Sequence, residues 1–324
     1  MTLTEAAFMR GGLPESTHAL LWCVTDASGA VVAESVAGAS TTQVFARSTV
    51  KPFQALPAVR AGVMQRFGLT DRHIAIACAS HGGTEEHLSA VLEILAACGC
   101  AEADLACGPL EPLDAAAADR LRARGALPGR LTHNCSGKHA LALALCRQED
   151  WPAAGYLETS HPLAVVMRAA VAEAAGAVPD ALPAGTDGCG MPTFHLPLVA
   201  IATAFGRLAG GDMGEDGTRV ADAMRSHPQL VAFDGAIDTE LMRAVPGLVA
   251  KVGAEGLLAI GLEDGRGLAL KVIDGAKRAV DPAGVAAVRV LLGRTASGEA
   301  LDRLARPEIR NSLGVVVGHG EARV

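Results

Sequence analysis

The sequence predicts a mixed α/β (α+β) protein in which strands from both chain ends form one antiparallel sheet around a helical insertion. Turn sequences at residues 26–29 and 263–266 are each flanked by apolar runs, the pattern of β-hairpins. Between these hairpins, apolar residues recur mainly at helical spacing. We therefore expect a single unit over residues 1–324, with a sheet part at about 1–80 and 240–324 and a mainly helical part at about 81–239.

The first part of the chain alternates between strand and helix signals. Residues 18–33 predict two strands around the first turn. A helix is expected to begin near Ser48, because apolar residues recur at helical spacing from Val50 to Val59. Residues 73–79 form a short apolar run that we expect to be a buried strand, and a further helix follows it.

The later elements are predicted from the same signals. An antiparallel sheet bordered by helices is expected to leave a cleft at that border, a usual place for an active site. The elements expected after the second helix are helices at 115–124, 138–147, 161–175, 198–208 and 220–224, hairpin strands at 257–262 and 267–273, a helix at 283–292 and a closing strand at 314–318.

Composition excludes several classes of protein. The 324 residues are 50% hydrophobic, so a large core is possible, whereas aromatic residues make up only 3%. A net charge of −7 and few aromatic side chains argue against nucleic-acid binding. The sequence shows neither a secretory signal nor an apolar stretch long enough to span a membrane. We therefore expect a cytoplasmic protein with no membrane partner, whose eight cysteines are thiols.

Lysine is rare in this chain, with five residues against 23 arginines. A buried lysine can lose its proton, whereas arginine stays charged, so the few retained lysines are candidates for catalysis. Ser48 precedes Lys51 by three residues, a spacing that places both side chains on one side of a helix. A desolvated amine could take the hydroxyl proton, and Arg47 could disfavour the ammonium form or bind a carboxylate. The alternative is a helix cap followed by a solvated lysine.

Two further polar sites follow from the same reasoning. Ser80 ends the apolar run at residues 73–79 and precedes a histidine and two glycines, which suits either an active site or a turn. Lys251 opens a Lys-Val-Gly stretch before the second hairpin. Penicillin-recognising hydrolases carry Lys-[Ser/Thr]-Gly at such a place, so the valine here weakens an interpretation as a β-lactam enzyme.

Two cysteines lie in glycine-rich, polar segments where packing gives no reason for a thiol. They are Cys135, near Lys138, and Cys189, near Asp187. Thiolates in such segments could bind a soft metal such as zinc, although no Cys-x-x-Cys spacing supports this and buried apolar cysteines are the alternative. Asp187 is suited to bind a substrate ammonium group or to orient a water molecule.

With these motifs, the chain resembles the rhizobial-type, or class 3, L-asparaginases. The Asn-Cys-Ser-Gly-Lys-His block is the most specific of the matches. Between the last two blocks the chain is shorter than is usual in that family, which bears on substrate range and zinc affinity. The matching blocks are residues 46–52 (ARSTVKP), 78–81 (CASH), 134–139 (NCSGKH), 185–189 (GTDGC) and 251–254 (KVGA).

The resemblance implies an enzyme that hydrolyses L-asparagine to L-aspartate and ammonia, with a serine β-lactamase-like (penicillin-binding-protein-like) fold and a homodimeric state. It implies an acyl-enzyme mechanism with two Ser–Lys pairs and a structural or substrate-positioning zinc ion. The implied residues are Ser48 with Lys51 and Ser80 with Lys251 for catalysis, Cys135, Lys138 and Cys189 for zinc, and Arg47, Asp187 and His139 for substrate binding.

Three other functions stay open on sequence alone. A glutaminase would be separated only by comparing the two amides as substrates. A β-lactamase-like or esterase Ser-x-x-Lys hydrolase would turn over a chromogenic β-lactam or an ester. A non-catalytic zinc-binding protein would bind zinc stoichiometrically and turn over no amide.

Overall fold

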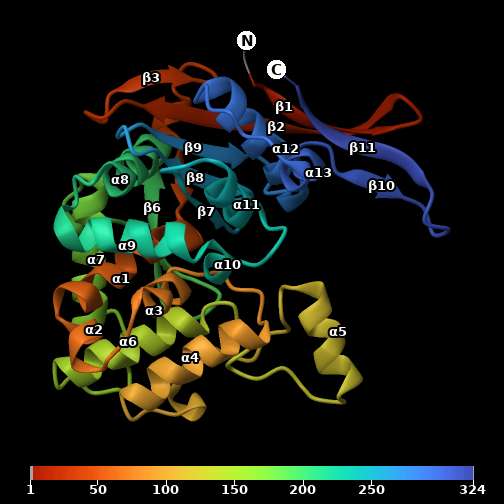
Figure 1. Ribbon diagram of the computed structural model, residues 1–324. Helices are drawn as coiled ribbons and strands as arrows, with labels where there is room; N and C mark the ends of the chain where they lie inside the picture. The colour runs from red at the N-terminus through yellow and green to blue at the C-terminus, as the bar shows by residue number, and fades with distance from the viewer. Residues whose placement is uncertain (1–2, 324) are drawn as a thin grey trace. The chain divides into compact units, whose positions relative to one another are not determined.

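The computed structural model describes residues 3–323 as a mixed α/β protein (Figure 1). The chain divides into two compact units. Unit 1 combines the residues up to Thr49 with Leu196–Gly210 and the residues from Gly235 on. Unit 2 combines Val50–His195 with Gly211–Asp234.

Unit 1 contains the predicted antiparallel sheet built from both ends of the chain. Figure 1 shows the N-terminal strands in red beside the C-terminal strands in blue. The strand order is β10-β11-β1-β2-β9-β8-β7, and β3 pairs with β2. The bounds are β1 (Glu5–Arg10), β2 (Leu13–Thr25), β3 (Val31–Glu34), β7 (Val249–Gly253), β8 (Leu257–Gly261), β9 (Gly267–Val272), β10 (Glu308–Arg310) and β11 (Val316–Arg323).

Helix α8 (Leu198–Gly210) covers the middle of this sheet and packs on β2, β8 and β9. The approach is close, because a Cβ atom on Gly267 would lie 1.8 Å from the carbonyl oxygen of Ala202. The remaining elements of unit 1 are β4 (Gln43–Phe45), α11 (Ile237–Ala244), α12 (Val280–Ala286), a π-helix (Ala287–Leu291), α13 (Glu299–Ala305) and the 3₁₀ turns Ala39–Thr41, Arg47–Val50 and Lys277–Ala279.

Unit 2 is mainly helical, and α6 (Ser136–Gln148) lies at its centre. This helix contacts α1, α3 and α4, and its residues from Ser136 to Cys146 are all buried. Small and aliphatic side chains on every face of α6 account for that burial. The other elements are α1 (Lys51–Arg60), α2 (Val63–Arg66), α3 (Asp71–Ala77), α4 (Glu85–Ala97), α5 (Ala115–Ala123), α7 (Pro162–Ala175), β5 (Ala184–Thr186), α9 (Gly214–Ser226), α10 (Pro228–Val231), two 3₁₀ turns (Glu102–Asp104 and Pro179–Ala181) and β6 (Pro192–Pro197), which crosses the unit boundary.

One predicted element is wrong. The run at residues 73–79 was expected to be a strand, but most of it belongs to helix α3, capped at Thr70 by the side chain of His73. Residues of α3 such as Ile74 and Ile76 are fully buried, so no polar face reveals the helical period. A short apolar run cannot by itself distinguish a buried helix from a buried strand.

Most other predicted elements are found within a few residues of their expected bounds. Strand β2 begins at Leu13, before the expected residue 18, and α9 begins at Gly214, before the expected residue 220. The expected helix at 283–292 continues α12 as a π-helix, and the closing strand β11 begins at Val316. Among residues 3–323, no helix combines the length and the apolar character needed to cross a membrane.

Candidate active site

Lys51 and Ser80 form a buried amine–hydroxyl contact in unit 2. Lys51 is the first residue of α1 and is only 1% exposed. Its Nζ atom lies 3.1 Å from Oγ of Ser80 and donates a hydrogen bond to the carbonyl oxygen of Ala79. The amine and the Ser80 hydroxyl are therefore within hydrogen-bond distance of each other in a buried environment.

The backbone around Ser80 is fixed by hydrogen bonds. The Ser80 amide donates to the carbonyl oxygen of Val231 at 2.9 Å, and the His81 amide donates to that of Asn134 at 3.2 Å. These contacts hold the segment after α3 against the segment that leads into α6. Ser80 is thus presented by ordered backbone, although it lies outside helices and strands.

His81 is a neutral positioning residue. Its Nδ1 accepts from the Gly83 amide at 3.1 Å, so Nε2 carries the proton and donates to Oγ of Ser136 at 2.8 Å. Burial lowers the pKa of His81 well below its ordinary value, and the nearby His87 adds to the shift. A histidine so strongly held in the neutral form orients the site without titrating near neutral pH.

Ser48 and Arg47 lie in unit 1, in the 3₁₀ turn Arg47–Val50 just before α1. Arg47 has a φ angle of 48°, a left-handed conformation that is rare for residues other than glycine and is often found at functional sites. Thr49 holds the turn through its amide and its hydroxyl, which donate to the carbonyl oxygen of Ala46 at 3.1 and 2.7 Å. Ser48 is 9% exposed, so it is not a solvated helix cap.

Lys251 lies at the centre of β7 in unit 1 and is fully buried. Its Nζ atom forms an ion pair with Oδ2 of Asp238, on α11, at 3.0 Å. It also donates to the carbonyl oxygen of Val252 at 3.1 Å. Sequence reasoning missed Asp238, because nothing in its local pattern connects it with a strand 13 residues away.

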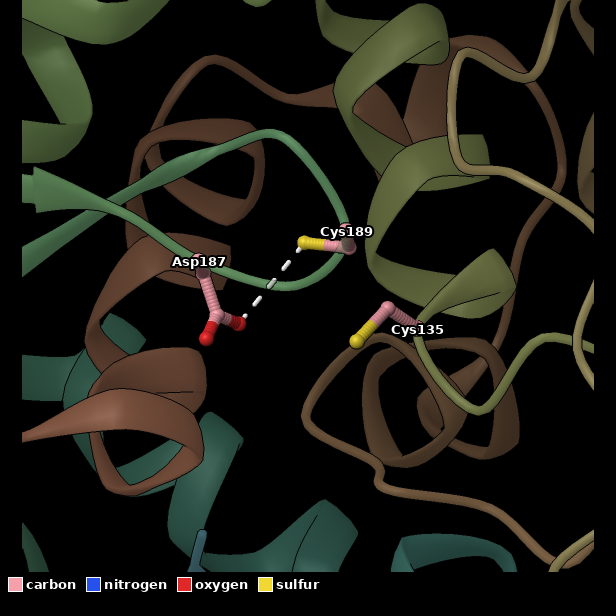
Figure 2. A group of neighbouring side chains, drawn as sticks. All are labelled: Cys135, Asp187 and Cys189. Atoms are coloured by element: carbon pink, nitrogen blue, oxygen red, sulfur yellow. Dashed lines mark hydrogen bonds between the residues drawn. The ribbon is translucent and has the colours of Figure 1, made fainter.

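The two predicted thiol residues come together with Asp187 (Figure 2). The Sγ atoms of Cys135 and Cys189 and a carboxylate oxygen of Asp187 all lie within 4.8 Å of one another. Figure 2 shows the three side chains converging. Sγ of Cys189 lies 3.8 Å from Oδ2 of Asp187. Lys138, on the first turn of α6, donates from Nζ to Sγ of Cys189 at 3.1 Å.

The charges of this cluster are strongly coupled. A hydrogen bond from Cys135 lowers the pKa of Cys189 far below its ordinary value, and the charge of Lys138 adds to the effect. The same hydrogen bond, together with burial, raises the pKa of Cys135. Burial acts against the charge of Lys138, but Cys189, Cys135 and Asp187 outweigh it and raise its pKa. These shifts favour the thiolate form of Cys189 and the ammonium form of Lys138.

The donor set suits a zinc ion. Two thiols, one carboxylate and one amine lie close together and are largely buried. Ligand atoms on a tetrahedral zinc are separated by roughly 3.3–3.8 Å, which follows from bond lengths of about 2.0–2.3 Å. The Lys138 Nζ–Cys189 Sγ distance of 3.1 Å and the Cys189 Sγ–Asp187 Oδ2 distance of 3.8 Å are close to that range. The residues therefore fit the metal that the resemblance implies.

His139 and Tyr156 contact each other beside the cysteine cluster. The Nδ1 atom of His139 lies 2.7 Å from the Tyr156 hydroxyl, which also accepts from the Ala106 amide at 2.8 Å. Nε2 of His139 is buried. Burial lowers the pKa of His139, and the neighbouring Cys189 acts in the opposite direction. Tyr156, the only tyrosine of the chain, was not singled out in the sequence.

The comparison with protein families decides the assignment. The family described as L-asparaginase II matches residues 6–322. The chain belongs to the L-asparaginase II family. It is an enzyme that hydrolyses L-asparagine, in agreement with the prediction from the sequence motifs.

Other comparisons add little to this assignment. No curated protein matches the chain. Among solved structures, the chain is similar to the crystal structure of Mglu in its native form in the presence of 4.3 M NaCl, with 15% identity and a TM-score of 0.38. The similarity covers 90% of this chain, which spans 66% of the other. The assignment to the asparaginases rests on the family match.

In this asparaginase the predicted site residues fall into three groups. Unit 2 brings Lys51 to Ser80 and, separately, gathers the cysteine cluster around Lys138. Unit 1 pairs Lys251 with Asp238. Within unit 2, Ser80 contacts Lys51. The pairing of Ser80 with Lys251, which the resemblance implies, stays a prediction because these residues belong to different units.

Proposed function

We propose that the asparaginase acts through a serine ester and that Lys51 is its central base. The observation that carries the proposal is the contact between Nζ of the buried Lys51 and Oγ of Ser80 at 3.1 Å. A lysine that loses its charge when desolvated can activate a hydroxyl group without a histidine or a metal. Ser48, three residues before Lys51 in the chain, supplies the attacking hydroxyl.

The proposed reaction has two halves. Ser48 Oγ attacks the side-chain amide carbon while its proton moves to Lys51. The proton then passes through the Ser80 hydroxyl to the leaving nitrogen, the C–N bond breaks, and ammonia departs from a β-aspartyl ester. Water attacks the ester in the second half, its proton returns through the same groups, and the C–O bond breaks to give L-aspartate and free Ser48.

Charged groups are proposed to bind the ends of the substrate. The Arg47 guanidinium suits the α-carboxylate, since arginine binds carboxylates with two hydrogen bonds. Asp187 suits the α-ammonium group, and His139 contributes a neutral polar contact. Lys251, implied by the resemblance, completes the proposed catalytic set.

Zinc is proposed as a resident ion held by Cys135, Lys138 and Cys189, with the Asp187 carboxylate adjacent. Bound zinc would supply a fixed positive charge that positions the substrate. The Ser–Lys groups already provide a nucleophile, so no metal hydroxide is needed.

The class 3 assignment and a serine β-lactamase-like fold are proposed together. An antiparallel sheet from both chain ends and a helical insertion support them, as does the retained Asn-Cys-Ser-Gly-Lys-His block. A homodimer is proposed from the resemblance, and sedimentation of the purified protein would test it. A cytoplasmic location is proposed from the composition, and fractionation of the cells that make the protein would test it.

The decisive experiment measures ammonia release from L-asparagine by wild type, Ser48→Ala and Lys51→Met. Both variants should lose at least about 100-fold in kcat. Lys271→Met is the matched control, because Lys271 donates only to backbone carbonyls in the described structure and should leave the rate unchanged. Acid quenching during turnover, followed by mass spectrometry, should reveal an aspartyl ester on wild type. Equal rates in all four proteins would rule out the mechanism.

A further inference from the structure

We propose that Asp238 is a positioning residue for catalysis, which acts by holding Lys251 in place as the cationic partner of a buried ion pair. The inference rests on the proposed function, since it assigns Asp238 a role through Lys251. Both residues lie in unit 1, Asp238 in the first turn of α11 and Lys251 on β7.

The geometry of the pair is constrained on both sides. Oδ2 of Asp238 accepts from Nζ of Lys251 at 3.0 Å and from the amide of Val252 at 3.2 Å. Nζ of Lys251 is shared between this carboxylate and the carbonyl oxygen of Val252. One carboxylate oxygen therefore fixes both the end of the lysine side chain and the backbone that carries it.

Burial makes the pair costly unless both charges are present. The side chains of Lys251 and Asp238 are 0% and 3% exposed. Removing one partner of such a pair leaves an uncompensated charge, whereas apolar residues of similar volume often serve as well for stability alone. Stability therefore gives little reason to place an ammonium here.

The ammonium group retains one donor for a reaction. Lysine has three N–H groups, and the contacts with Asp238 and Val252 use two of them. Among the described residues Lys251 has no further acceptor. Asp238 thus aims the third N–H, so that Lys251, the cationic partner of the ion pair, serves as a fixed hydrogen-bond donor. This differs from the neutral amine required of Lys51.

The test is a double-mutant cycle with Asp238→Asn, Lys251→Met and the combination of both, measured for kcat, KM and free energy of unfolding. Asp302→Asn is the matched control, because Asp302 forms an ion pair with Arg289 at 2.8 Å but is 67% exposed. Asp238→Asn should lower kcat at least about tenfold and change KM less than threefold. The double variant should have the kcat of Lys251→Met, and Asp302→Asn should match wild type.

The outcomes distinguish a failure of the positioning role of Asp238 from a failure of the catalytic role of Lys251. Wild-type kcat in Asp238→Asn, or a double variant far slower than Lys251→Met, would overturn the positioning role. If Lys251→Met itself keeps wild-type kcat, the catalytic role of Lys251 in the proposed mechanism fails instead. If Asp238→Asn does not fold, Asp238→Glu replaces it in the test, because glutamate keeps the charge and should restore folding. The longer side chain should displace Lys251 and so still lower kcat. Wild-type kcat in Asp238→Glu would also overturn the positioning role.

Discussion

Nζ of Lys51 lies 3.1 Å from Oγ of Ser80, although 29 residues separate the two in the chain. The lysine begins a helix, and the serine follows the end of another, so their contact depends on how α1 and α3 pack in unit 2. The contact supports the proposed role of Ser80 as a proton relay beside Lys51.

Ser80→Ala should therefore slow catalysis while leaving substrate binding nearly intact. Loss of a positioned proton-transfer group typically costs about 10²–10⁴ in rate. We expect kcat to fall by at least about 100-fold and KM to change little. Ser28→Ala is a suitable control, because Ser28 lies in the exposed turn of the first hairpin. A Ser80→Ala enzyme with more than half of wild-type kcat would contradict the relay.

Mild acid should destabilise the folded protein, chiefly through its buried histidines. Burial lowers the pKa of His81, His87 and His73 below the ordinary value of 6.5. The unfolded chain then binds more protons than the folded one, so stability falls as pH drops through 6.5. From pH 7 to 5.5, His81 alone should cost about 1 kcal/mol, and the other two add to it.

One carboxyl group acts in the opposite direction. Burial raises the pKa of Asp281 to about 6, so protonation of the folded state regains about 1 kcal/mol over the same interval. The three histidines together outweigh it. Urea unfolding at pH 7 and pH 5.5 measures how much unfolding free energy the protein loses between the two pH values. This loss should be about 1 kcal/mol smaller in His81→Gln. Equal or greater stability of wild type at pH 5.5 would disprove the argument.

Local sequence patterns predicted the antiparallel sheet from both chain ends and most helices. The glycine-rich context of Cys135 and Cys189 correctly marked two thiols that the fold brings together, although 54 residues separate them. The Ser-x-x-Lys spacing likewise singled out Lys51 as a buried amine.

Contacts made by packing could not be predicted in the same way. The partner of Lys51 in unit 2 is Ser80, and that of Lys251 is Asp238 on an ordinary helix. Neither pairing has a periodic or motif signal. Tyr156 belongs to the same class, since its hydroxyl matters only because the fold places it beside His139.

Loss of either cysteine should remove zinc. Cys135→Ser and Cys189→Ser each delete a soft ligand, so purified variants should contain much less than one equivalent by elemental analysis, whereas wild type should contain about one per chain. Cys98→Ser is the control, since Cys98 is also buried but lies at the C-terminal end of α4 and is not a member of the cluster. If wild type purified in the presence of zinc contained no zinc, that result would contradict the proposed metal site.

Gly137, in the Asn-Cys-Ser-Gly-Lys-His block, lies where α6 packs so closely on α3 that no side chain fits. A Cβ atom at this position would lie 2.2 Å from the carbonyl oxygen of Ile76, so α6 and α3 could not approach as they do. Alanine improves helix propensity by about 1 kcal/mol, but a clash with backbone in a packed core typically costs about 1–3 kcal/mol or more. We therefore expect Gly137→Ala to be destabilised overall.

The same substitution should damage function beyond stability. Cys135 and Lys138 flank Gly137, and Ser80 follows the end of α3, so forcing the two helices apart moves the cysteine cluster and the Lys51–Ser80 contact together. Gly137→Ala should lower kcat and zinc content even where it is fully folded, as judged by circular dichroism. Gly108→Ala is the control, because no atom lies within 4 Å of its added Cβ. If Gly137→Ala and Gly108→Ala had equal free energies of unfolding and equal activities, the close approach of α3 and α6 would be dispensable.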